Sequence, residues 1–246
     1  MSLRFLTRLG FKILRTTSSE FRAYSDLFVP PYSTWMDWRT GVGPAAHVLY
    51  GLIRALMPET VVETGSARGF STCAMALACR QNGRGRVFAI DPHAPNDWTQ
   101  HGVQGSTEVF LRQRLAQYEL QPWCEILRST TKEIERTWQR KVDFLFIDGD
   151  HSLDGVRSDF EIFKPWFNPH ALVAFHDSAW EHGKDWDSHD VAKVYPRLGV
   201  PEFLAHLQKS GLESITIHHL PGLTILDPTP GGFAFLSGRP DMAVTD

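Results

Sequence analysis

Two patterns of apolar and polar residues alternate along the chain. Short, nearly continuous apolar runs predict buried strands, and longer segments with one apolar face predict helices. We expect strands at residues 60–65, 86–92, 124–129, 142–150 and 171–177, followed by a closing pair at 214–220 and 232–238. We expect helices at residues 44–57, 70–83, 105–120, 130–138, 153–167 and 202–211.

Strands that are apolar throughout and separated by helices are typical of a parallel sheet covered on both faces. We therefore expect an α/β fold with a doubly wound, mostly parallel, Rossmann-like sheet and helices on both faces. Ligands of such folds bind beyond the carboxyl ends of the strands. This rule places residues 63–69, Asp91, Ser129, 148–151 and 176–177 along one edge of the sheet.

The first 22 residues form a pattern of their own. Basic residues recur about every four positions among apolar ones: Arg4, Arg8, Lys12 and Arg15. This pattern predicts a basic amphipathic helix, which could lie on an anionic membrane surface or pack on its own domain or on a partner subunit of a homo-oligomer. The segment lacks the apolar core and cleavage site of a signal peptide. We expect residues 1–43 to be a helical extension that could also cover the substrate, and residues 44–246 to be one domain.

Composition narrows the classes of protein that the chain can represent. Its net charge is −3, and no basic tract in the body of the chain indicates nucleic acid as a partner. The three cysteines, Cys73, Cys79 and Cys124, form no CxxC pair, which argues against a disulfide scaffold or a zinc–cysteine site. We expect a cytoplasmic protein.

A glycine turn follows the first predicted strand. Gly65 and Gly69 would let the backbone approach a ligand and would leave the amides of the next helix accessible. Asp91 ends the following strand, 22 residues beyond Gly69, where an acid can accept both hydroxyls of a ribose. A plain chain reversal also explains the glycines, but together with Asp91 they favour a nucleoside ligand.

Glu63, just before the turn, indicates which nucleoside. A carboxylate there would repel a pyrophosphate but suits the cationic methionine end of S-adenosylmethionine. The spacing is also not the G-x-G-x-x-G of dinucleotide-binding folds. The residues that we expect to contact the cofactor are Glu63, Gly65, Ser66, Gly69, Ser71, Asp91, Pro92, Ser129 and Asp148.

Three stretches carry a family resemblance: VVETGSARGFST, AIDPH and FLFIDGDHSLDGVRSDFEIFKPWFNPHALVAFHD. They resemble the class I S-adenosylmethionine-dependent methyltransferases, and more narrowly the small-molecule O-methyltransferases that include macrolide-sugar and cephalosporin hydroxylase-like proteins. The similarity covers residues 44–236. It implies a seven-stranded sheet with the last strand antiparallel. It also implies methyl transfer to a hydroxyl of a small molecule, such as a sugar or glycoside.

Asp148 and Asp177 end neighbouring predicted strands, with one crossover helix between them. Adjacent carboxylates repel unless a cation or a shared proton holds them. Oxygen ligands favour Mg²⁺, Mn²⁺ or Ca²⁺, and the resemblance implies a metal held at these two strand ends. The third ligand stays open between His176 and Asp150.

His151 lies three residues after Asp148, where the resemblance implies a general base. Its ordinary pKa suits proton transfer near neutral pH, and we expect His151 and Asp148 to act in catalysis. Alternatively, His151 caps the helix that begins near Leu153, in competition with Ser152 and Asp154. We expect Asp159 and Glu161, on that helix, to be solvated or salt-bridged.

Two other classes of protein remain as alternatives. A nicotinamide-dependent oxidoreductase shares the fold, but the chain lacks both G-x-G-x-x-G and a plausible Tyr-x-x-x-Lys pair. A non-catalytic methyltransferase-like binding protein would not need the candidate site, yet Glu63, Gly65, Asp91 and Asp148 are all present.

Overall fold

The computed structural model describes residues 42, 45–94, 106–179, 199–218 and 222–228. The basic helix predicted at the N-terminus lies outside these residues, so its contact with a membrane or partner remains a prediction. None of the described helices is long and apolar enough to cross a membrane.

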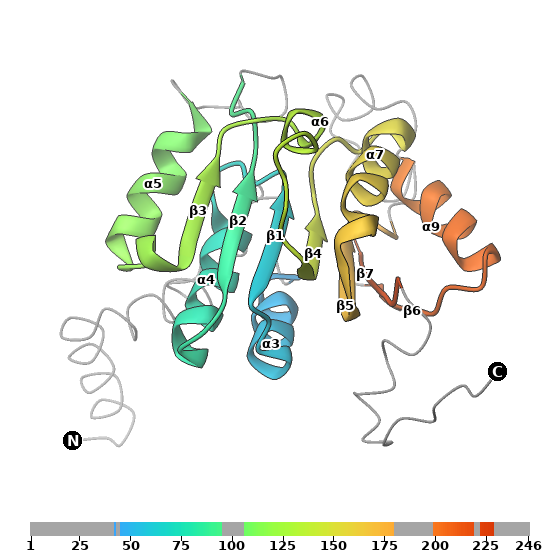
Figure 1. Ribbon diagram of the computed structural model, residues 1–246, viewed down its shortest axis with the longest axis horizontal. Helices are drawn as coiled ribbons and strands as arrows, with labels where there is room; N and C mark the ends of the chain where they lie inside the picture. The colour runs from blue at the N-terminus through green and yellow to red at the C-terminus, as the bar shows by residue number, and fades with distance from the viewer. Residues whose placement is uncertain (1–41, 43–44, 95–105, 180–198, 219–221, 229–246) are drawn as a thin grey trace, which may run out of the picture.

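The sheet has seven strands in the order β3-β2-β1-β4-β5-β7-β6 (Figure 1). Their bounds are Thr60–Thr64 (β1), Arg86–Ile90 (β2), Cys124–Leu127 (β3), Val142–Ile147 (β4), Phe167–His176 (β5), Ser214–Ile217 (β6) and Leu223–Leu226 (β7). Strands β1 to β5 are parallel, and β7 pairs antiparallel with both β5 and β6. The structure confirms the predicted fold.

Within the described residues, the last strand is one that we did not predict. The antiparallel strand is Leu223–Leu226, whereas residues 232–238 lie outside the described part of the chain. The four residues of Leu223–Leu226 are too short a run for hydrophobic periodicity to distinguish a strand from a loop.

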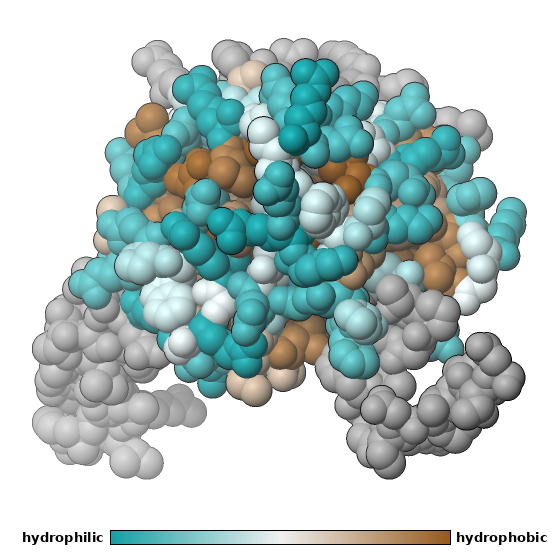
Figure 2. Space-filling model, viewed as in Figure 1, coloured by the Kyte–Doolittle hydropathy of each residue, from teal (hydrophilic) through white to brown (hydrophobic). Residues whose placement is uncertain are grey.

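Helices cover both faces of the sheet: α3 (Ala45–Leu56), α4 (Phe70–Asn82), α5 (Thr107–Gln117), α6 (Thr131–Ile134), α7 (Leu153–Phe163) and α9 (Gly199–Lys209). Alternate strand residues feed two cores. Val61 packs with α3, α4 and α5 on one face, and Val62 packs with α7 and α9 on the other. Hydrophilic side chains cover most of the face shown in Figure 2, and apolar residues appear there in patches between elements.

Helices α6 and α7 each end four residues before their predicted ends. Helix α7 ends at Phe163, because Pro165 lies in a 3₁₀ turn, Lys164–Trp166, after which β5 begins at Phe167. Helix α6 stops at Ile134, and Trp138 beyond it packs edge-on against Phe163.

The register brings the carboxyl ends of the central strands to one edge. Thr64 of β1 is level with both Ile90 of β2 and Ile147 of β4, and Ile147 is level with Phe175 of β5. The strand order reverses between β1 and β4, which is where ligands bind in open α/β sheets.

Candidate functional site

The glycine turn and the loop after β4 touch through their backbones. Gly65 has φ of +85°, and a Cβ atom there would lie 2.0 Å from the carbonyl oxygen of Asp148. The Asp148 N–H donates to the carbonyl of Thr64 at 3.0 Å. Both the positive φ and the contact require glycine at position 65.

Gly69 begins helix α4. Its φ is +79°, and it offers no side chain to cap the helix. A Cβ atom at Gly69 would lie 2.2 Å from Cδ1 of Leu111, so α5 packs directly on the turn. Because α4 follows the carboxyl end of β1, its uncapped amino end lies at the predicted cofactor edge. The amides there suit an anionic group.

Glu63 is fully buried beside this turn. Its carboxyl group accepts hydrogen bonds from the hydroxyls of Ser71 and Thr72 at the start of α4. Burial raises the pKa of Glu63 to about 8, although the two hydrogen bonds lower it. Glu63 and Ser71, both predicted cofactor contacts, thus bind each other in the protein alone.

Asp91 joins the end of β2 to the glycine turn. Oδ2 accepts from the N–H of Ala67 at 2.8 Å, and Oδ1 accepts from the N–H of His93 at 2.6 Å. Both Ala67 and His93 have left-handed backbones, with φ of +40° and +49°. These bonds fix the orientation of the carboxylate that we expect to accept the ribose. Pro92, between Asp91 and His93 in the sequence, is exposed.

Ser129 lies beside Asp91, as predicted, but its hydroxyl is engaged elsewhere. Its N–H donates to the carbonyl of Asp91 at 3.2 Å. Its hydroxyl donates to Glu133 Oε2 at 2.9 Å, alongside the capping box that Thr130 and Glu133 form. In this arrangement only the backbone of Ser129 is part of the predicted cofactor edge.

Asp148, His151, His176 and Asp177 form one group, which we name the His–Asp cluster. His176 Nδ1 lies 2.9 Å from Asp148 Oδ1 and 3.2 Å from Asp177 Oδ1. His151 Nδ1 lies 2.7 Å from Asp177 Oδ2, and its Nε2 lies 3.6 Å from Asp148 Oδ1. Each histidine therefore lies between the two carboxylates.

The charges of the His–Asp cluster support one another. Burial opposes ionisation of Asp148, but the positive charges of His176 and His151 outweigh it and lower the pKa to about 2. Burial also lowers the pKa of His176, yet Asp148 and Asp177 raise it to about 9. Burial lowers the pKa of His151 as well, but Asp177 and, less strongly, Asp148 raise it well above its ordinary value. The two imidazoles and the Asp148 carboxylate thus stabilise one another's charged forms.

Three members of the cluster have the geometry to hold a metal. Within the described residues, ligand atoms of Asp148, His151 and Asp177 all lie within 4.8 Å of one another. The two residues proposed as the third ligand, His176 and Asp150, are not in that group, which contains His151 instead. Asp150 Oδ1 accepts the N–H of Ser152 at 2.9 Å at the start of α7.

The capping alternative for His151 is wrong. Ser152 is the N-cap of α7, and its hydroxyl accepts the N–H of Gly155 at 3.0 Å. The imidazole of His151 is instead part of the His–Asp cluster.

Several buried polar atoms at this edge lack a hydrogen-bond partner in the described part of the chain. They include Ser66 Oγ after β1, His93 Nε2 after β2, both ring nitrogens of His176, and Ser178 Oγ after β5. The Nδ1 atom of His176 lies close to the carboxylates of Asp148 and Asp177 all the same. Buried polar groups are nearly always paired, so these atoms indicate a polar ligand at the edge. We had predicted neither His93 nor Ser178.

Asp159 also corrects the sequence analysis. We expected it to be solvated or salt-bridged, but only 7% of it is exposed. It shares the buried face of α7 with Val156, Phe160 and Phe163, a helical spacing that could have revealed its burial. Glu161 does lie at the surface, 3.5 Å from Lys164 Nζ.

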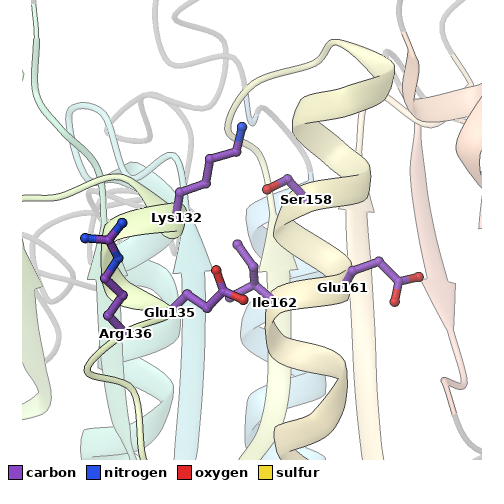
Figure 3. Close-up of a pocket in the computed structure, with 6 residues that line it drawn as sticks. All are labelled: Lys132, Glu135, Arg136, Ser158, Glu161 and Ile162. Atoms are coloured by element: carbon purple, nitrogen blue, oxygen red, sulfur yellow. The ribbon is translucent and has the colours of Figure 1, made fainter.

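A surface pocket of about 460 Å³ lies between α6 and α7 (Figure 3). Its lining residues are Lys132, Glu135, Arg136, Ser158, Glu161 and Ile162. None of them belongs to the predicted site, and their charges are of both signs. The candidate site is the strand edge instead.

The strand order, the glycine turn, the acid after β2 and the acidic end of β4 resemble those of the class I S-adenosylmethionine-dependent methyltransferases. Among the comparisons, residues 62–178 match the family model of a methyltransferase domain. The matched segment covers most of strands β1 to β5, at the centre of the sheet.

Several known proteins are similar to this chain. An uncharacterized protein of Sinorhizobium fredii is 28% identical over 71% of the chain, but the matched region spans only 19% of that protein. The structure of the Podospora anserina methyltransferase PaMTH1 with bound S-adenosylhomocysteine has a TM-score of 0.62 at 11% identity, over 92% of this chain and 96% of that one. The O-methyltransferase TomG of Streptomyces achromogenes, in complex with S-adenosylmethionine, has a TM-score of 0.55 at 19% identity, over 86% and 89%. Likenesses this distant establish the fold.

Proposed function

We propose that the protein transfers a methyl group from S-adenosylmethionine to a hydroxyl oxygen of a small molecule, such as a sugar or glycoside. The observation that carries the proposal is the direct contact between the glycine turn and the acidic loop. Because Gly65 touches the backbone of Asp148, a cofactor held over the turn lies next to the His–Asp cluster.

The residues of the edge fit the cofactor. Asp91 offers a fixed carboxylate for the ribose, and the unpaired hydroxyl of Ser66 and uncapped start of α4 offer polar groups for its other end. Glu63 supplies a buried carboxyl group that a nearby ammonium or sulfonium cation would ionise. The bound cofactor supplies an electrophilic methyl group on sulfur.

His151 is the proposed general base. Asp177 binds its Nδ1, and Nε2, which lies 3.6 Å from Asp148 Oδ1, is the nitrogen that we propose to accept the proton of an acceptor hydroxyl. The carboxylates of Asp177 and Asp148 raise the pKa of His151, which opposes its action as a base. A divalent cation between Asp148 and Asp177 would lower the pKa of both histidines and free the base.

We therefore include a divalent cation in the proposal. Asp148 and Asp177 would hold it through oxygen, and a ring nitrogen of His176 could complete the set. Carboxylates suit Mg²⁺, Mn²⁺ and Ca²⁺, while an imidazole ligand shifts preference toward Mn²⁺ and other transition metals. The oxidoreductase alternative has no support from the comparisons.

The test is a methyl-transfer screen with the full chain and labelled S-adenosylmethionine. Sugars and glycosides are offered as acceptors with Mg²⁺, with Mn²⁺ or with EDTA, and the variants Asp148→Asn and Glu161→Gln are compared. We expect transfer that requires a cation and Asp148 but not Glu161. If EDTA leaves transfer unchanged, the cation has no part in the reaction. If only nitrogen or sulfur acceptors are methylated, the proposed transfer to oxygen is contradicted.

A further inference from the structure

A buried carboxyl group of α7 lies close to the loop that carries the His–Asp cluster. Asp159 faces the sheet, and its carboxyl group lies beside the side chains of Thr64 and Thr131. Thr64 ends β1, and Thr131 begins α6. Burial raises the pKa of Asp159, while the two hydroxyls lower it. Asp159 thus connects three elements that meet at the edge of the candidate site.

Asp159 also reaches the loop itself. A Cβ atom at Gly149 would lie 3.1 Å from Asp159 Oδ2 and 3.5 Å from Thr64 Oγ1. Gly149 lies between Asp148 and His151, so the carboxyl group packs against the centre of the loop. The carbonyl of Thr64 accepts the N–H of Asp148, which joins the same loop to the end of β1.

We propose that Asp159 is a positioning residue, which fixes the loop of residues 148–151 against the glycine turn. It would contact neither cofactor nor acceptor, and would act through Asp148 and His151. Its effect on methyl transfer rests on the proposed function, but the position of the loop can be measured independently. Displacements of about 1 Å at such groups can reduce turnover about a hundredfold.

The test uses the full chain labelled with ¹³C-histidine. The imidazole NMR signals of His151 are identified by their absence from the spectrum of the variant His151→Gln. Asp159→Ala should shift the His151 signals. Because the displaced loop lies against the glycine turn, calorimetry should also show S-adenosylmethionine binding weakened about tenfold, a loss comparable to that of one hydrogen bond. Asp159→Asn keeps the shape of the side chain and its contact with the loop, and should leave both quantities near those of the wild type. The matched control Glu161→Ala, on the exposed side of α7, should change neither.

A second variant separates positioning from general loss of stability. Gly149→Ala places its Cβ against Asp159 and should shift the His151 signals in a folded protein. In the Asp159→Ala background the same substitution should add little, because the oxygen that it meets is gone. If Asp159→Ala does not fold, Gly149→Ala alone decides. Unchanged His151 signals in either folded single variant would overturn the proposal. A folded wild type that fails to bind S-adenosylmethionine would instead overturn the proposed function, since the His151 signals need no cofactor.

Discussion

The Nδ1 atom of His151 lies 2.7 Å from Oδ2 of Asp177. Asp177 has a φ of +53°, a conformation that non-glycine residues adopt at a cost of about 1–3 kcal/mol. That conformation immediately follows β5, where it brings the carboxylate to the imidazole. The ring is thus bound at one nitrogen, while the other lies on the side of Asp148.

Asp177→Asn should lower the pKa of His151. Burial already lowers this pKa, and the charge of Asp177 is the strongest opposing influence, so its removal shifts the balance toward burial although Asp148 still raises the pKa. An NMR titration of the imidazole in metal-free protein measures the change. The matched control, Glu161→Gln, should leave the pKa of His151 unchanged. The same pKa of His151 in Asp177→Asn as in the wild type would refute this pairing.

Gly65→Ala should destabilise the protein by about 3 kcal/mol or more, because its Cβ atom would meet the Asp148 carbonyl and its φ is positive. The matched control is Gly51→Ala in helix α3, where a Cβ atom has nothing within 4 Å. That control should stabilise by about 0.5–1 kcal/mol, because alanine favours a helix over glycine. Urea denaturation of both variants checks the pair, and equal effects would contradict the backbone contact.

Glu63→Gln should change how stability depends on pH. Since the folded protein raises the pKa of Glu63 from 4.5 to about 8, its stabilising contribution is complete below pH 4.5 and is lost as the pH rises through 8. Glutamine cannot ionise, so the variant should gain stability relative to the wild type by up to about 1.4 kcal/mol per pH unit in this window. Denaturation curves at pH 5 to 8 test this, and parallel stability profiles would rule out a buried, protonated Glu63.

Much of the fold could be predicted because its signals are local. Apolar runs identified β1 to β5, and the parallel arrangement followed from the helices between them, which brought Gly65, Asp91 and Asp148 to one edge. The short strand β7 was missed because Leu223–Leu226 is too brief to show a period.

The candidate site was harder to predict, because its chemistry depends on contacts between distant residues. The sequence could indicate Asp148, His151 and Asp177 as chemical groups, but not that histidines lie between both carboxylates. Asp159 was misread because its polarity was weighed above its position on the apolar face of α7. Sequence spacing places a residue on a face, whereas pKa and hydrogen bonding come from the packed elements around it.

Calorimetric titration of the full chain with S-adenosylmethionine tests the central claim most directly. We predict one binding site per chain in the wild type and in Glu161→Ala. Asp91→Ala should bind about a hundredfold more weakly, because it removes charged hydrogen bonds to the ribose. Folded wild-type protein that gives no binding heat at any cofactor concentration, or an Asp91→Ala variant with unchanged affinity, would contradict the account.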